Sequence, residues 1–158
     1  MTKQTIVTPR FGEIEYEQHD VLHFTEPLLG FPNSSSFIIL SHEQHRPFKW
    51  LQCLDDPSIA FLVIDPANVI PSYAPELPET DAQELQLLPD TARIVYVIAN
   101  IPKGKPQDIT LNLAAPIVIN AEKGIAKQVI IEDPQYPIRQ KILQEQEIIW
   151  AEAHSTAA

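Results

Sequence analysis

Short apolar runs separated by proline-rich turns follow one another along most of this chain. The clearest example spans residues 48–66, FKWLQCLDDPSIAFLVIDP, in which two apolar runs flank the pair Asp55–Asp56. Each run ends at an Asp–Pro step, which disfavours helical backbone at the aspartate and favours a turn. The pattern therefore predicts a β-hairpin.

Similar runs before and after this hairpin predict further strands, because alternating or continuous apolar positions over four to eight residues are typical of strands. These strands cover residues 4–7, 13–17, 21–24, 37–40, 93–99, 109–113, 117–120 and 126–131. The run 93–99, RIVYVIA, is apolar on both faces, which indicates a central strand. The last two runs are expected to pair across the turn Glu122-Lys123-Gly124.

One internal segment has helical rather than strand spacing. Residues 81–88 predict a short helix in which Leu85 and Leu88 form one apolar side. Thr80 and Gln83 fit a capping box at its start. A helix of this length serves as a lid or an edge cover.

The pattern changes again at Pro137, a residue that suits the first position of a helix. Ile138, Ile142 and Ile149 then fall near one side, joined by Leu143 and Trp150. This predicts a C-terminal helix that docks on the rest of the protein or on a partner.

Nine or ten short strands with little helix predict a mostly β fold, a small antiparallel β-barrel-like domain or a sandwich with one or two short helices. Regular alternation of strands and helices is missing, which argues against a doubly wound sheet. The length of 158 residues fits one domain. We place the barrel-like domain at residues 1–143 and a C-terminal extension, partly helical or frayed, at 144–158.

The composition agrees with a folded protein outside the membrane. Apolar residues make up 44% of the chain and charged residues 20%, and no apolar stretch approaches the roughly 20 residues of a membrane helix. The first residues lack the apolar core of a signal peptide, so we expect a cytoplasmic location. Fifteen prolines against four glycines favour short strands and rigid turns.

The formal net charge of −10 narrows the class of partner. Phosphate backbones attract Lys and Arg, so the charge argues against direct nucleic-acid binding. It favours a basic partner, whose approach it would speed, or it serves solubility alone.

Candidate chemistry is sparse. His19 and His23 on a strand would lie about 13 Å apart, too far for one metal ion, and His42 and His45 fit a solvated loop. Adjacent aspartates point to opposite faces of a strand and do not converge on a substrate, so we expect Asp55 and Asp56 to bond their own turn. No phosphate-binding or nucleophile motif occurs, and we expect no catalytic residue, cofactor or metal.

The chain has a single cysteine, Cys53, so it forms no internal disulfide. Its neighbours are Leu51, Gln52 and Leu54, which suggests packing within a strand. We expect a buried and unreactive thiol.

Several segments taken together, in order and spacing, resemble the FliW family of flagellar assembly factors. The matching segments are 11–13 (FGE), 30–32 (GFP), 47–52 (PFKWLQ), 54–57 (LDDP), 60–61 (AF), 65–66 (DP), 112–120 (NLAAPIVIN) and 127–130 (KQVI), with Tyr136 and Arg139 near the end. They span about residues 11–139. Cys53 departs from the small polar residue expected there, and the tail from Gln144 is longer than is typical of the family.

The resemblance implies a small β-barrel-like protein without enzymatic activity that binds flagellin in the cytoplasm. It also implies binding to CsrA, an RNA-binding translational repressor, as an alternative partner. Holding CsrA keeps it from flagellin messenger RNA, either by covering the RNA surface or through coupling between two sites. Two alternatives stay open: an export chaperone for flagellin only, and a small-ligand or metal-binding barrel hydrolase.

A partner surface should combine acidic turns with apolar groups. We expect a protein that is monomeric alone and contacts partners through Phe31, Pro32, Trp50, Asp55, Asp56, Asp65 and Tyr73. Core packing is the alternative role for the aromatic members. Turn formation is the alternative role for Asp55 and Asp56, which otherwise contact CsrA or flagellin.

Overall fold

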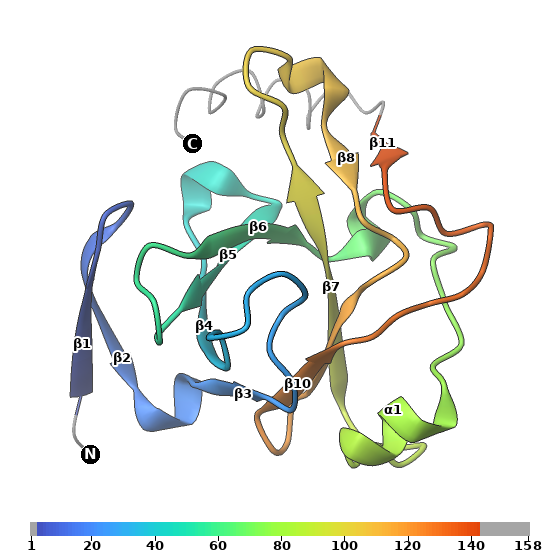
Figure 1. Ribbon diagram of the computed structural model, residues 1–158, viewed down its shortest axis with the longest axis horizontal. Helices are drawn as coiled ribbons and strands as arrows, with labels where there is room; N and C mark the ends of the chain where they lie inside the picture. The colour runs from blue at the N-terminus through green and yellow to red at the C-terminus, as the bar shows by residue number, and fades with distance from the viewer. Residues whose placement is uncertain (1–2, 143–158) are drawn as a thin grey trace.

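The computed structural model describes residues 3–142, which form eleven strands, one α-helix and four 3-10 helices (Figure 1). The strands are β1 (Lys3–Thr8), β2 (Gly12–Glu17), β3 (Leu22–Phe24), β4 (Ser36–Leu40), β5 (Phe48–Cys53), β6 (Ala60–Ile64), β7 (Arg93–Asn100), β8 (Thr110–Leu111), β9 (Ile117–Asn120), β10 (Ile125–Gln128) and β11 (Gln140–Lys141). The helices are η1 (Gln18–Asp20), η2 (Glu43–His45), η3 (Pro66–Asn68), α1 (Glu79–Glu84) and η4 (Pro106–Asp108).

Seven strands close into a barrel in the order β7-β6-β5-β4-β3-β10-β9, with β9 pairing back onto β7. Neighbouring strands are antiparallel except for β3 and β10, which are parallel. Strand β7 closes the ring because it is long: its second half pairs with β6 and its first half with β9. Closure leaves these seven strands without a free edge. The predicted barrel, the hairpin over residues 48–66 and the central strand over 93–99 are all confirmed.

Alternation along each strand separates the interior from two outer clusters. The interior is filled by Phe24, Leu28, Phe37, Leu51, Cys53, Val63, Tyr96, Ile117, Ile119 and Ala126. On the outer face of β5, β6 and β7, a second cluster forms beneath β8 and Ile142. A third lies on the outer face of β9 and β10, where Leu85 from the end of α1 packs against Val118 and Val129.

Strands β1 and β2 form a separate two-stranded sheet beside the barrel (Figure 1). The tip of this hairpin contacts β5, because Arg10 lies 4.7 Å over the Trp50 ring and the Phe11 ring is 5.4 Å from it. Aromatic and cation–π contacts of this kind hold the hairpin against the barrel.

The predicted helix over residues 81–88 is shifted toward the N-terminus, and its capping box is wrong. Helix α1 begins after Pro78, which occupies the N-cap without a side-chain hydrogen bond. Thr80 is therefore already inside the helix. Gln86 adopts a left-handed backbone with φ 55°, which ends the helix early. Leu85 is fully buried while Leu88 is 65% exposed, so the role of a cover is carried by Leu85.

The predicted helix from Pro137 is wrong over the described residues. Gln140–Lys141 pairs as β11 with β8, and Ile142 is buried in the outer cluster beneath it. Strand pairing and burial of Ile142 outweigh the helical spacing, and Ile138 stays 65% exposed. Leu143, Ile149, Trp150 and the extension at 144–158 lie outside the described residues.

Candidate functional site

The two ends of the barrel differ, and one of them is closed by the chain itself. We call it the closed end; it consists of the loops 25–35 and 54–59. Leu28 is 2% exposed and joins the barrel interior. Its N–H donates to the buried Ser34 hydroxyl at 3.3 Å, and that hydroxyl donates to the carbonyl of Phe31 at 2.7 Å. The loop therefore serves as an internally bonded plug.

Asp55 ties the two closed-end loops together. Its Oδ2 accepts hydrogen bonds from the backbone N–H of Ser35 at 2.7 Å and of Ser36 at 2.8 Å. Burial alone would raise the pKa of Asp55, but these hydrogen bonds outweigh it and hold the pKa below its usual value. The carboxylate is thus a structural acceptor that joins two loops.

Asp56 stabilises the neighbouring turn. Its Oδ1 accepts hydrogen bonds from the Ser58 hydroxyl at 2.6 Å and the Ser58 N–H at 3.0 Å, which lower the pKa of Asp56. Asp56 therefore bonds its own turn as predicted, whereas Asp55 bonds the other closed-end loop, and that part of the prediction is wrong. Their contact with a partner stays a prediction.

Phe31 and Pro32 lie in the same closed-end loop. Phe31 is 37% exposed, and its ring packs edge-on against Phe61 with 5.0 Å between the centroids. Pro32 is exposed. The closed end therefore brings together four of the predicted partner-binding residues: Phe31, Pro32, Asp55 and Asp56.

Trp50 is placed elsewhere, in an aromatic cluster at the hairpin tip. Its indole Nε1 donates a hydrogen bond to His45 Nδ1 at 3.1 Å, and Phe11 joins it to His42, whose ring stacks on Phe11 at 5.5 Å. Both histidines lie in the loop between β4 and β5, where His42 is exposed as predicted and His45 is half-buried. Both also pack against aromatic rings.

Asp65 and Tyr73 occupy a third region, where they line a groove of about 200 Å³ on the outer wall. Asp65 caps η3 by accepting a hydrogen bond from the N–H of Ala67 at 2.9 Å. The Tyr73 hydroxyl donates to the carbonyl of Leu113 at 2.7 Å, and burial raises its pKa. Tyr73 packs against the outer cluster, which matches the core role considered for it.

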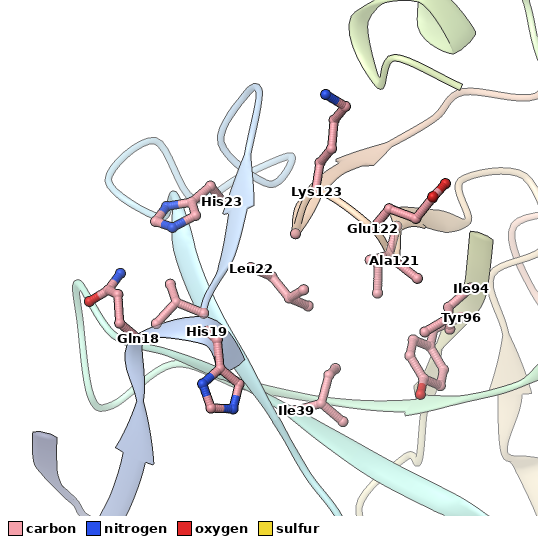
Figure 2. A pocket seen from close by; sticks show the side chains of 13 residues that line it. Gln18, His19, Leu22, His23, Ile39, Ile94, Tyr96, Ala121, Glu122 and Lys123 are labelled. Atoms are coloured by element: carbon pink, nitrogen blue, oxygen red, sulfur yellow. The ribbon is translucent and has the colours of Figure 1, made fainter. Parts of the chain in front are cut away.

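The opposite end of the barrel opens into a cavity of about 490 Å³, which we call the open end (Figure 2). Its walls are interior-facing side chains at strand ends: Leu22, Ile39, Ile94, Tyr96 and Ile119. Its rim is formed by η1 and by the turn between β9 and β10. Barrel mouths are a common position for binding sites, and this volume lies in the usual range.

Two carboxylates lie beside His19, a rim residue of the open end. His19 Nε2 lies 3.1 Å from Glu17 Oε2 and 3.4 Å from Asp20 Oδ1, and these three groups cluster closely. Asp20 also accepts a hydrogen bond from the Glu17 N–H and so caps η1. His19 lies in η1 and His23 in β3, so the predicted spacing of the two histidines along one strand is wrong.

Comparison with known proteins agrees with this architecture. The sequence pattern of the FliW protein family matches residues 5–142. The chain is 41% identical over 141 residues to the flagellar assembly factor FliW of Thermoanaerobacter pseudethanolicus, covering 89% of this chain and 93% of that protein. It is 40% identical over 144 residues to the FliW of Syntrophus aciditrophicus, covering 91% and 90%.

This chain belongs to the FliW family of flagellar assembly factors. A crystal structure of the flagellar assembly factor FliW superimposes with a TM-score of 0.81 at 30% identity, covering 90% of this chain and 99% of that one. The resemblance stated from sequence motifs is therefore confirmed, together with the barrel fold. Flagellar assembly factors are not a known class of enzyme. Over residues 3–142, no helix has the length and apolar character needed to cross a membrane.

The motifs that carry the family resemblance form mainly walls and turns of the FliW barrel. The segments 47–52 and 60–61 lie in the central hairpin, and 54–57 forms the closed-end turn. The open end was missed by sequence reasoning, since none of its wall residues was singled out. The sequence carries only a weak signal for the open end. Ile94 belongs to a run that is apolar on both faces, which predicts burial, whereas its side chain is 41% exposed in the structure.

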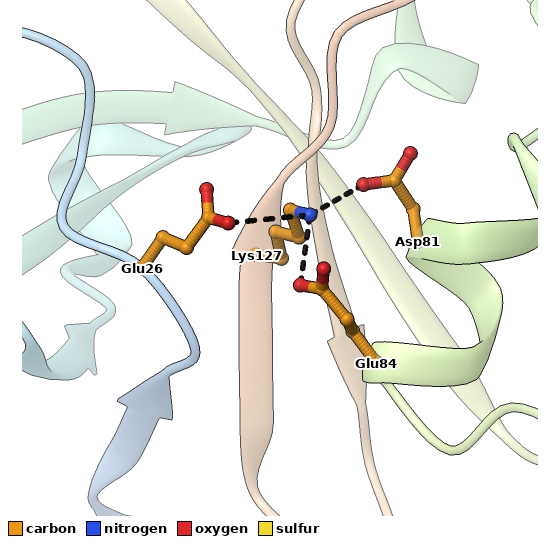
Figure 3. Close-up of polar contacts among 4 residues, drawn as sticks. All are labelled: Glu26, Asp81, Glu84 and Lys127. Carbon is orange, nitrogen blue, oxygen red and sulfur yellow. Dashed lines mark hydrogen bonds and ion pairs between the residues drawn. The ribbon is translucent and has the colours of Figure 1, made fainter.

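A buried lysine connects three parts of this FliW fold (Figure 3). Lys127 on β10 lies 2.6 Å from Asp81 and 2.8 Å from Glu84 on α1, and 3.8 Å from Glu26 in the closed-end loop. Burial alone would lower the pKa of Lys127, but the hydrogen bonds to Asp81 and Glu84 outweigh it and raise the pKa. The ammonium group therefore fastens the helix and the loop to the barrel wall.

Cys53 is fully buried in the barrel interior, as predicted. Burial raises the pKa of its thiol, which keeps it protonated and poorly nucleophilic. Its position beneath the closed end makes this thiol a natural reporter of whether that end is intact.

Proposed function

We propose that this chain is a cytoplasmic, non-enzymatic assembly factor that binds flagellin and, as an alternative partner, CsrA. In this proposal, the chain removes CsrA from flagellin messenger RNA when flagellin is exported, and translation of flagellin resumes. Membership of the FliW family over residues 5–142 carries the proposal.

The charge of the chain supports the regulatory half. A repressor that holds RNA is basic, because its surface must neutralise phosphates. A chain with a net charge of −10 attracts such a protein and does not itself attract RNA. The proposed factor therefore acts on CsrA and leaves the messenger untouched.

Two other functions have less support. An export chaperone for flagellin alone could use the same fold. That function does not explain why the net charge of the chain is suited to a basic partner. A metal-dependent or small-ligand hydrolase needs converging donors or carboxylates. Asp55 instead accepts hydrogen bonds from the loop at Ser35 and Ser36, and Asp56 bonds its own turn. His42 and His45 pack among aromatic rings.

Binding measurements with the purified full chain against flagellin and CsrA separately test the proposal. We expect a complex with each, mutual competition between them, and a CsrA complex that weakens as salt is raised. The chain should also lower the affinity of CsrA for flagellin messenger RNA. If the affinity of CsrA for flagellin messenger RNA is unchanged at a saturating concentration of the chain, the regulatory half of the proposal is wrong. If the chain then binds flagellin alone, the export-chaperone function is left.

A further inference from the structure

The barrel interior is completed at one end and left incomplete at the other. At the closed end, Leu28 enters the interior and is 2% exposed. At the open end, none of the described residues fills the interior as Leu28 does at the closed end. The apolar wall there borders a cavity of about 490 Å³. Ile94, on this wall, is 41% exposed.

The cavity is suited to a side chain of a protein partner. Leu22, Ile39 and Tyr96 converge on it from three different strands (Figure 2). Its polar groups lie at the rim, on η1 and on the β9–β10 turn. An apolar side chain in a desolvated pocket with a polar rim is the usual arrangement of an energetic anchor at a protein interface.

The rim indicates the charge of that partner. Glu122 and Lys123 line the cavity together with His19 and His23, and the carboxylates of Glu17 and Asp20 lie within 3.4 Å of His19. Three carboxylates against one ammonium group favour a segment with Lys or Arg beside its apolar anchor. Of the two partners proposed above, CsrA is the basic one.

We propose that the open end of the barrel is a docking site for a large apolar side chain that CsrA presents within a basic segment. The inference rests on the proposed function. It assigns one of its two partners to one surface. It leaves the closed end, with Phe31, Pro32, Asp55 and Asp56, outside the CsrA contact.

The test uses a matched pair of substitutions in the full chain. Ile94→Gln removes apolar character at the open end. Ile130→Gln makes the same change at a residue that follows β10 at the closed end and is 46% exposed, close to the 41% of Ile94. The two variants share their chemical change and their exposure and differ in the end of the barrel that they alter.

We expect the dissociation constant for CsrA to rise at least tenfold in Ile94→Gln and to change less than twofold in Ile130→Gln. Ala121→Trp is a second variant for the open end, since this exposed residue lines the cavity and a larger side chain there fills it without removing an existing contact. It should also weaken CsrA binding at least tenfold, which keeps the test decisive if Ile94→Gln folds poorly.

Several outcomes overturn the inference. Unchanged affinity for CsrA in both open-end variants would overturn it. Tighter binding of CsrA by these variants would also overturn it, and is the result expected if residues 143–158 of the chain itself compete for the cavity. Loss of flagellin binding alone, or a dimer of the wild-type chain that dissociates in Ile94→Gln, assigns the cavity to flagellin or to a second copy. If the wild-type chain does not bind CsrA at all, the regulatory half of the proposed function fails, and the inference fails with it.

Discussion

The closed and open ends belong to one barrel and are lined by the same kinds of apolar side chain. They differ in whether a loop of the chain covers the barrel interior. At the closed end, loop 25–35 brings Leu28 into the interior and is bonded through Ser34 and Asp55. At the open end, the described chain stops at the rim, and the strand ends border a cavity. One end is therefore organised for folding, whereas the other is available for binding.

The contrast also separates two kinds of apolar exposure. Leu28 contributes to stability because folding removes nearly all of its surface from water. Ile94 keeps 41% of its surface exposed, so part of its burial is left for complex formation. Substitutions at the two ends should accordingly divide between loss of stability and loss of affinity.

The largest effect on stability is expected from Leu28→Ala. The substitution leaves a cavity at the end of the barrel interior and should lower the free energy of unfolding by about 3 kcal/mol. Urea unfolding followed by circular dichroism measures this. Leu29→Ala, one residue on and 60% exposed, is the control and should change it by less than about 0.5 kcal/mol. Equal losses of unfolding free energy in the two variants would show that Leu28 does not stabilise the barrel by closing its interior.

The same variant can be followed at Cys53, the single cysteine of the chain. In the wild-type protein the buried thiol should react slowly with a thiol reagent, because it is protonated and covered. Leu28→Ala should accelerate labelling, since the end above the thiol is opened. An open-end variant such as Ile94→Gln should leave the rate unchanged, and equal acceleration in both would remove the distinction between the ends.

A smaller loss is expected for Lys127→Met, which releases α1 and Glu26 of the closed-end loop. Breaking a fully buried ion pair costs about 3–5 kcal/mol, but the Glu84 side chain is 42% exposed, so we expect about 2 kcal/mol. Urea unfolding measures the loss, with the exposed Lys103→Met as control. A loss no larger than in that control would show that the lysine does not fasten these elements.

Asp55→Ala should cost about 1–2 kcal/mol, because two backbone N–H groups lose a charged acceptor. The effect should depend on pH. The pKa of Asp55 is lower in the folded than in the unfolded state, so its contribution is present above the unfolded pKa of about 3.9 and is lost as pH falls through the folded pKa. The difference in stability between wild type and variant should therefore shrink as pH falls below the unfolded pKa and through the folded pKa. A difference that stays constant as Asp55 becomes protonated in the folded protein would contradict this role.

The smallest effect on stability is expected at the open end. Ile94→Gln should lower the free energy of unfolding by less than about 1 kcal/mol, because the side chain is already partly in water. Thermal and urea unfolding measure it beside Leu28→Ala. A loss as large as that of Leu28→Ala would mean that the open end is also part of the folding core.

The barrel walls could be predicted from the sequence because their signals are local. Strands β5 and β6 follow from apolar runs and the Asp–Pro turns between and after them, and β7 from its continuous apolar run. Pairing across the Glu122-Lys123-Gly124 turn was confirmed for the same reason. The helix predicted from Pro137 was wrong because a tertiary contact, the pairing of β11 with β8, outweighed the local helical pattern.

The difference between the two ends could not be predicted from the sequence. Leu28 and Leu29 are adjacent and identical, yet one is 2% and the other 60% exposed, because the path of the loop decides which side chain enters the barrel. The exposure of Ile94 likewise depends on barrel closure, which pairs it with Ile119 far along the chain. The predicted site residues were dispersed over three regions for the same reason.

Amide hydrogen exchange of the full chain, with and without CsrA, tests the assignment of the two ends most directly. The account predicts slower exchange on binding in residues 18–23, 93–96 and 119–125 around the open end. It predicts unchanged exchange in residues 28–35 and 54–59 at the closed end. Protection of the closed-end loops, with exchange around the open end unaltered, would contradict it.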